Sequence, residues 1–345
     1  MVKPALLREH ELAFRTQYAE LKERVRAAGS LLPGTPGTLV RRSGTGYPYW
    51  YRVFYPVPGT QSEALVCKDG DADALQSMRE AISFSVWVSA QVSNLRKLGF
   101  QVADKSVARV LVELHNQGAF EAGLVLVGTL GHMAWLNELG VMAVSARTLD
   151  IDLARRQELK LAAPISFLTT LQVTGLPFKA VPGMPVKQVS TSVKLPGVQG
   201  LRVDVLAPGN KIGAFVRVPE LDWAAQAIPY YDYLLEAPEP GAMLAGGHCI
   251  PVRLPQAARL VWHKLYSSTD RHGFPEKAAK DRYQALVLAA VLAETDPRAL
   301  TLAFKGAPGA MTKKIRPLYS RVVKELNANA TLREVLRECL KPNSK

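Results

Sequence analysis

Three aspartates lie in apolar segments of this sequence, where charged side chains are unusual. Asp150 and Asp152 alternate with Leu149, Ile151 and Leu153, and Asp204 sits in the apolar run 201–206. On a β-strand, residues two apart point to the same face, so Asp150 and Asp152 would project together while their apolar neighbours enter the core. A neighbouring strand could bring Asp204 to the same place.

Carboxylates a few ångströms apart repel one another and raise each other's pKa values, and divalent cations relieve that repulsion. Mg²⁺ or Mn²⁺ prefers a few carboxylates together with triphosphate oxygens, and two ions about 4 Å apart can act on both oxygens of an in-line phosphoryl displacement. Asp150, Asp152 and Asp204 are therefore candidate ligands of divalent cations. The alternative for a D-x-D pair is a solvated strand face.

A Gly-Thr pair, Gly128 and Thr129, precedes this aspartate pair by one helix-length segment. Together these residues resemble the signature of the DNA polymerase β-type nucleotidyltransferase superfamily. That signature is a strand, a Gly-Ser/Thr turn opening a helix, a D-x-D strand and a third Asp on a later strand. The form Arg147-Thr148-Leu149-Asp150-Ile151-Asp152 resembles the bacterial branch that includes the abortive-infection type IV toxin nucleotidyltransferases.

The resemblance implies a role for each matched residue. Asp150 and Asp152 would ligate metal, and Asp204 would ligate metal and activate the acceptor hydroxyl. The nucleotide would be held by the turn and by the residues before the aspartate pair, which are Gly128, Thr129, Arg147 and Thr148. In this sequence Leu130 and Gly131 follow the turn, which departs from the usual pattern.

A second match lies further along the chain, where Lys264 precedes Lys280 and Asp281. It resembles the Lys…Lys-Asp element that the toxin-like branch places after its core, with the lysine facing phosphate and the aspartate beside the site. A cation near a pyrophosphate leaving group is chemically apt, because charge grows there in the transition state. The alternative is a helical hairpin with surface lysines and a capping aspartate.

The elements that position these residues can be read from hydrophobic periodicity and from Gly/Pro breaks. Helices are expected over 5–28, 71–118 with an interruption at Gly99, 130–139, 165–176, 255–267, 278–294 and 313–328. Strands are expected within 38–67 and over 123–128, 148–154, 178–182, 188–195 and 201–206, and the chain after Pro219 is expected to be mostly helical. The fold class is α/β (α+β), with a small mixed-sheet core.

Four regions are expected from these changes of pattern. They are an N-terminal helix with a small aromatic, arginine-rich β-sheet (1–70), a helical connector (71–118), the nucleotidyltransferase core (119–220) and a basic, mainly helical C-terminal domain (221–345). The aromatics of the first region, with Arg41, Arg42 and Arg52, suit base stacking and phosphate contact. The alternative is that they only supply the core of a small sheet.

Net charge points to a polyanionic partner. The chain carries +13, and from Arg253 to Lys345 there are 18 Lys/Arg against 8 Asp/Glu. An excess of this sign favours nucleic acid, nucleoside triphosphates or an anionic surface. Lys313, Lys314 and Arg316 begin one helix of this region and either contact phosphate or form a solvated face.

Several other classes of protein and of binding site are disfavoured by the sequence. The sequence contains no G-x-x-x-x-G-K-[ST] and no G-x-G-x-x-G, so a P-loop or dinucleotide site is not supported. Cys67, Cys249 and Cys339 are far apart and odd in number, which favours buried thiols in a reducing cytoplasm. The histidines lack metal-ligand spacing, and His132 is expected to be packed or solvated. No membrane span and no secretory leader are expected.

The sequence therefore predicts a cytoplasmic, metal-dependent enzyme that moves an NMP from an NTP to a hydroxyl, with pyrophosphate release. RNA, in particular a tRNA 3′ end, is the expected acceptor. A protein or small-molecule acceptor, and a catalytically inactive nucleic-acid-binding member, are the alternatives. From the resemblance, a toxin role with a cognate antitoxin or other regulatory protein as partner is also expected.

Overall fold

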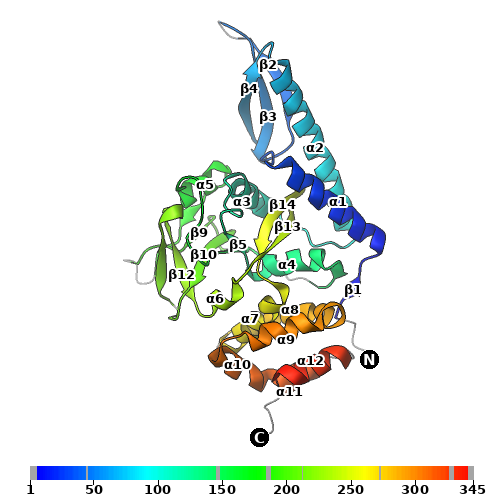
Figure 1. Ribbon diagram of the computed structural model, residues 1–345. Helices are drawn as coiled ribbons and strands as arrows, with labels where there is room; N and C mark the ends of the chain where they lie inside the picture. Colours follow the sequence, from blue (N-terminus) through cyan, green and yellow to red (C-terminus); the bar gives the residue numbers. More distant parts are fainter. Residues whose placement is uncertain are drawn as a thin grey trace.

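A mixed β-sheet lies at the centre of the computed structural model, which describes residues 6–43, 46–144, 148–183, 188–211, 213–271, 273–325 and 330–340 (Figure 1). Its strands run in the order β11 (Phe215–Val218), β12 (Trp223–Ile228), β10 (Arg202–Pro208), β7 (Asp150–Ala154) and β5 (Val125–Leu126). Strands β12, β10 and β7 are parallel, whereas β11 and β5 run antiparallel to their neighbours. The expected α+β class with a mixed sheet is confirmed.

Strand β10 has a different neighbour along each half of the same edge. Its first half pairs with β9 (Ser192–Lys194), which in turn pairs with β8 (Lys179–Ala180), and its second half pairs with β12. The apolar residues of β7 and β10 that point away from the aspartates are fully buried, as the alternation predicts. Leu149 is an exception, because it precedes β7 and is 41% exposed.

Helix α4 (Gly128–Glu138) follows β5 directly and is buried on almost every side. It contacts β7 and the hairpin of β13 (Glu239–Ala245) and β14 (His248–Leu254). Helix α3 (Lys105–Asn116) packs on the other side of that hairpin, and α5 (Phe167–Val173) contacts α3. One hydrophobic core joins these elements, so the helix that carries Thr129 is held rigidly against the sheet.

The prediction of a mostly helical chain after Pro219 is wrong for residues 223–254. Strands β12, β13 and β14 occupy most of that stretch, with the short helix α6 (Tyr231–Leu234) between the first two. Gly246 and Gly247 both have positive φ, and they close the β13–β14 hairpin. Paired glycines between apolar runs are a strong hairpin signal, because the favoured two-residue turns need positive φ.

Among the described residues from 257 onward the chain is helical, as predicted, although the helix expected over 313–328 is divided between α10, a 3₁₀ turn and α11, and residues 326–328 lie outside the described residues. Helices α7 (Ala257–Thr269) and α8 (Pro275–Thr295) pack side by side, and α8 also contacts α4 (Figure 1). The remaining helices lie on their far side: α9 (Pro297–Lys305), α10 (Gly309–Ile315), α11 (Tyr319–Glu325) and α12 (Ala330–Leu340). Single 3₁₀ turns span Pro219–Leu221 and Arg316–Leu318.

The N-terminal region forms a three-stranded antiparallel sheet and two helices. Strands β2 (Thr38–Arg42), β3 (Tyr49–Val57) and β4 (Thr60–Lys68) lie beside α1 (Leu12–Ala28) and α2 (Ala72–Lys97) (Figure 1). The first helix begins later than expected, because β1 (Arg8–Glu9) precedes it and pairs with β6 (Val141–Met142). The break expected at Gly99 is confirmed between α2 and α3.

The three arginines of this sheet are engaged within it. Arg41 and Arg42 form ion pairs with Asp69 and Glu63. Arg52 is 3% exposed and donates to the carbonyl oxygens of Pro33, Thr35 and Pro36. Burial lowers the pKa of Arg52 to about 10. These contacts engage all three arginines within the N-terminal region, which disfavours the phosphate contacts expected of them.

Two further expectations can be compared with the described residues. The three cysteines are free and buried, as predicted. None of the helices in the described segments is both long and apolar enough to cross a membrane.

Replacing Arg52 with alanine should destabilise the N-terminal sheet. Three buried carbonyl oxygens would lose a charged donor, at a cost of about 3 kcal/mol in the free energy of unfolding. Arg42→Ala is the matched control, since that exposed ion pair should contribute less than about 1 kcal/mol. Urea unfolding of both variants measures the difference, and equal stability of the two would contradict the bracing role of Arg52.

Candidate active site

A cleft of about 520 Å³ opens between the aspartate-bearing face of the central sheet, the start of α4 and the α7–α8 pair. Its lining includes every site residue expected from the sequence except Arg147, which lies outside the described residues. These are Gly128, Thr129, Thr148, Asp150, Asp152, Asp204, Lys264, Lys280 and Asp281. Residues more than 150 positions apart in the chain thus meet in one cavity of a size that suits a nucleotide.

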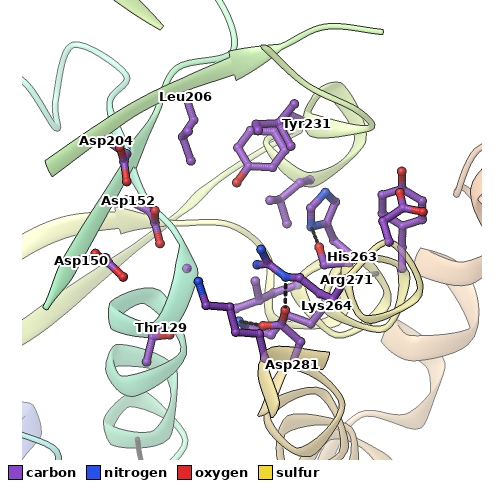
Figure 2. Close-up of a pocket in the computed structure, with 18 of the residues that line it drawn as sticks. Thr129, Asp150, Asp152, Asp204, Leu206, Tyr231, His263, Lys264, Arg271 and Asp281 are labelled. Carbon is purple, nitrogen blue, oxygen red and sulfur yellow. Dashed lines mark hydrogen bonds and ion pairs between the residues drawn. The ribbon is translucent and has the colours of Figure 1, made fainter. Parts of the chain in front are cut away.

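The carboxylates come from two adjacent parallel strands. Asp152 of β7 is directly opposite Asp204 of β10, and Asp150 is opposite Arg202. The prediction that a neighbouring strand brings Asp204 beside the pair is therefore confirmed in register. Figure 2 shows the three aspartates along one wall of the cleft, with Lys264, Arg271 and Asp281 on the facing wall.

Gly128 lies where α4 begins and leaves room for Asp152. Its φ is +66°, and a Cβ atom built on it would come within 1.9 Å of the Asp152 Oδ2 atom. Any larger residue here would be strained and would clash with the carboxylate. The amide of Val127 donates to the Asp152 carbonyl oxygen, which ties the turn to β7. Gly131, the departure noted in the sequence, similarly lets α4 approach the Leu126 carbonyl oxygen.

Thr129 is buried, and its hydroxyl oxygen accepts a hydrogen bond from the Lys280 ammonium at 3.2 Å. The two residues come from α4 and α8, so this contact links the start of one helix to the first turns of the other. The Thr129 hydrogen stays available to a ligand. A hydroxyl, a lysine and a helix N-terminus in one place form a favourable environment for an anion.

The pKa of Asp152 is raised to about 6, mainly by burial and then by the charges of Asp204 and Asp150. Lys264 and Lys280 oppose that rise from across the cleft. Within the described segments neither Asp150 nor Asp152 forms a side-chain ion pair or hydrogen bond through its carboxylate. None of the described residues places a cation in contact with the Asp152 carboxylate, so its ionised form would be stabilised by a bound cation.

Asp204 is held differently. Its Oδ1 atom accepts hydrogen bonds from Ser192 of β9 and from Arg202, whose Nε lies 2.8 Å away. Arg202 also donates to the Ser192 hydroxyl oxygen at 2.7 Å. These contacts fix one oxygen of Asp204 and leave the other toward the cleft.

The opposite wall contains a buried ion-pair network. The Lys264 ammonium lies 3.6 Å from one Asp281 oxygen, and Arg271 donates to the other at 3.2 Å. Lys264 and Asp281 are each 5% exposed, and burial lowers the pKa of Lys264 despite the attraction of Asp281. The alternative of surface lysines with a capping aspartate is therefore wrong for Lys264 and Asp281. Such a cation gains stability from any further negative charge in the cleft.

Sequence reasoning assigned no role to several residues that line the cleft. Arg202 could have been found from its alternation with Asp204 on one strand face, whereas Tyr231 had no sequence signal. His263 directly precedes Lys264 in the sequence and lines the cleft as well. Burial lowers the pKa of His263 to about 4, so it is neutral, and its ring packs edge-on against Tyr231. His132 is fully buried, as expected, and does not line the cleft.

Divalent cations fit the donor chemistry of this wall. Asp150 and Asp152 offer oxygen ligands of the kind Mg²⁺ prefers, on one face and without side-chain partners among the described residues. In the described part of the chain, however, no group of three or more His, Cys, Asp or Glu side chains is placed to hold a metal ion. The turn of Asp204 toward Ser192 and Arg202 is consistent with that finding. The structure thus provides two available carboxylates with a third beside them.

Comparison with known proteins adds one match. A family model described as nucleotidyltransferase matches residues 105–308, more than half of the chain. The matched range includes α3, the central sheet, the cleft and helices α7 to α9. A search of curated proteins found no match, and neither did a search of solved structures.

Asp152→Asn should stabilise the protein when divalent ions are absent. A folded-state pKa near 6 lies above the unfolded value, so ionisation of Asp152 opposes folding. That cost is absent below about pH 4 and complete above about pH 6, where removing the charge should gain about 1–3 kcal/mol.

Thermal unfolding in EDTA at pH 8 and pH 4 measures this gain. The exposed Glu121→Gln substitution, which removes a charge elsewhere, should leave the transition unchanged at both pH values. A variant no more stable than wild type at pH 8 would argue against carboxylate repulsion at the site.

Proposed function

Since this chain belongs to the nucleotidyltransferase family, we propose that the cleft transfers an NMP from an NTP to an acceptor hydroxyl and releases pyrophosphate. The observation that supports this proposal most directly is the opposition of two walls. Asp150, Asp152 and Asp204 lie on the strand side, and Lys264 and Lys280 lie on the helix side. A triphosphate with its cations can bridge such walls, because its charge complements both.

Asp150 and Asp152 would hold Mg²⁺ or Mn²⁺, with Asp204 beside them. Two such ions would neutralise triphosphate charge and stabilise the attacking and leaving oxygens. The raised pKa of Asp152 supports this role, since a bound cation would remove the repulsion that raises it.

Gly128, Thr129 and Lys280 would bind the triphosphate. The amides at the start of α4 and the Thr129 hydroxyl can donate to phosphate oxygens, and Lys280 is already within hydrogen-bond distance of that hydroxyl. The Thr148 hydroxyl accepts a hydrogen bond from the Asp150 amide, so Thr148 would lie on the same side of the bound nucleotide. Arg147 is assigned to the nucleotide from the sequence alone.

Asp204 would accept the proton of the acceptor hydroxyl as its oxygen attacks the α-phosphorus. Ser192 and Arg202 fix one carboxylate oxygen, which leaves the second to take that proton. The bond from the α-phosphorus to the bridging oxygen of the β-phosphate then breaks, and pyrophosphate carries away the electron pair.

Lys264 would stabilise the charge that develops on this leaving group. Asp281 and Arg271 hold the network that positions its ammonium. In this arrangement Asp281 acts as a positioning residue, because its two oxygens are already occupied by cations. Preorganised charges of this kind stabilise a transition state without further rearrangement.

RNA is the acceptor that we propose, with a tRNA 3′ end as the first to test. Arg271 and Lys277 line the rim of the cleft, and most of the further Lys/Arg excess after Arg253 is on α9 to α12, beyond α7 and α8. Lys314 is less available, because it pairs with Asp270. The resemblance to toxin enzymes makes a cognate antitoxin or other regulatory protein the corresponding partner.

Lys280→Gln should slow NMP transfer about tenfold or more, because a charge-assisted contact to phosphate would be lost. The assay incubates the protein with each radiolabelled NTP, Mg²⁺ or Mn²⁺, and either total tRNA or cell lysate. Lys160→Gln, an exposed change of equal charge outside the cleft, should retain full activity.

The acceptor class follows from where the label appears. Label on RNA supports the proposed acceptor. Label on protein or on a small molecule would show that the acceptor is of that class, with the same transfer chemistry. Full transfer by Lys280→Gln or by Asp152→Asn would contradict the site assignment.

If RNA is the acceptor, its affinity should fall steeply as salt rises. Each phosphate neutralised by Lys or Arg releases condensed counterions, so the logarithm of the binding constant should fall linearly with the logarithm of salt, by about 0.7 per contact for single strands. Fluorescence anisotropy over a salt series measures the slope. A flat response would point to a small or protein acceptor.

A further inference from the structure

A second cavity lies away from the aspartate cleft and shares no lining residue with it. It has a volume of about 350 Å³ and is formed where the end of β3, helices α2 and α3, and the turn of the β13–β14 hairpin meet. Its polar lining comes from three hydroxyl residues, one histidine and two cations: Thr35, Ser85, Ser89, His248, Lys105 and Arg109. No acidic side chain is among the residues that line it.

The two cations of this cavity lack partners. Within the described segments, neither Lys105 nor Arg109 forms a side-chain ion pair or hydrogen bond. Arg109 is half-buried, and burial lowers its pKa. Half-buried arginines are usually paired, because removing a guanidinium from water without a partner is costly. An anion bound in the cavity would supply the missing partner.

The walls of this cavity are fixed by close packing. A Cβ atom on Gly246 would meet the Lys105 Cα atom at 2.7 Å, and one on Gly247 would meet the Ser89 Oγ atom at 2.8 Å. Both glycines have positive φ, so the hairpin turn can approach α2 and α3 only with these residues. His248 is held from the same turn by a contact of its Nε2 atom with the Leu32 carbonyl oxygen at 3.2 Å. The cavity is therefore part of a rigid frame.

Tyr55 supplies an aromatic surface at the edge. Tyr55 is 46% exposed, although both its backbone amide and its carbonyl oxygen are hydrogen-bonded to Thr35. An exposed ring on a fixed backbone beside free cations is the combination on which nucleobases stack while their phosphates are neutralised. Other arginines of this region are engaged in the sheet, which leaves Lys105 and Arg109 as the cations that face this space.

We propose that this cavity is a nucleotide-binding site, with the phosphate on Lys105 and Arg109 and the base on Tyr55. Its volume is at the small end of ligand pockets, which suits one nucleotide unit and not a larger ligand. The unit is either a free nucleoside monophosphate or one residue of a single-stranded RNA, since the same chemistry recognises both. The assignment depends on neither the metal nor the transfer reaction.

Arg109→Gln tests this proposal with the full-length protein in EDTA. Calorimetric titration with AMP and with inorganic phosphate, and anisotropy with a fluorescently labelled RNA of about ten nucleotides, provide the three binding measurements. Affinity for AMP, the RNA or both should fall about tenfold or more in Arg109→Gln and recover partly in Arg109→Lys. Tyr55→Leu should weaken AMP or RNA and leave inorganic phosphate unchanged.

Two controls separate this cavity from other sources of binding. Arg79→Gln removes an equal charge from an exposed position of α2 outside the cavity and should leave every affinity unchanged. Lys280→Gln alters only the aspartate cleft. The binding of AMP or RNA that is lost in Arg109→Gln should therefore be retained in Lys280→Gln.

Binding of AMP alone would identify a free nucleotide as the ligand, and binding of RNA alone would identify a polynucleotide; both outcomes support the site. Unchanged affinity in Arg109→Gln, or an equal loss in Arg79→Gln, would overturn it. Arg109→Gln is not expected to impair folding, because it removes a half-buried charge without a partner, and thermal unfolding checks this.

Discussion

The pairing of β7 with β10 is the constraint on which the rest of the site depends. Their register sets Asp152 directly opposite Asp204, and burial of Ile151, Leu153, Val203 and Val205 on the other face prevents either strand from shifting. A slip by one residue would bury the carboxylates and expose the core. The protein thus stabilises an unfavourable concentration of negative charge with hydrophobic packing on the reverse side of the same two strands.

The other walls of the cleft provide space, hydrogen-bond donors and positive charge opposite these carboxylates. Gly128 leaves the space that the Asp152 carboxylate occupies, and the N-terminus of α4 presents donors beside it. Lys264 and Lys280 come from the α7–α8 pair, which contacts α4 as well, so one helix fixes the distance between the two walls. Lys264 is buried, so water cannot stabilise its charge. Its ion pair with Asp281 stabilises that charge and holds the ammonium in place. Opposite charges are held apart by the fold, with a gap that a charged nucleotide can fill.

The N-terminal sheet illustrates how composition alone can mislead. Aromatic and arginine residues in close succession suit RNA binding, yet Arg41, Arg42 and Arg52 are all engaged within the sheet. Within the described segments, Lys105 and Arg109 of α3 line the second cavity without a side-chain ion pair or hydrogen bond, and no sequence motif singles them out. Binding capacity depends on which charges remain unpaired after folding, and pairing is a property of tertiary contacts.

The sequence by itself determined the local part of this protein. Alternation around Asp150 and Asp152 was sufficient to predict their strand and the shared face of their carboxylates, because local periodicity fixes which face a side chain occupies. The family resemblance added the Gly128–Thr129 turn and the Lys264…Lys280-Asp281 element as expected parts of the same site. Only the tertiary structure decided the parts that depend on distant contacts. It placed β13 and β14 where helices were expected, brought Ser192 and Arg202 onto Asp204, and added Tyr231 and His263 to the lining. Those contacts join strands and helices far apart in the chain, and no local pattern specifies which of them become neighbours.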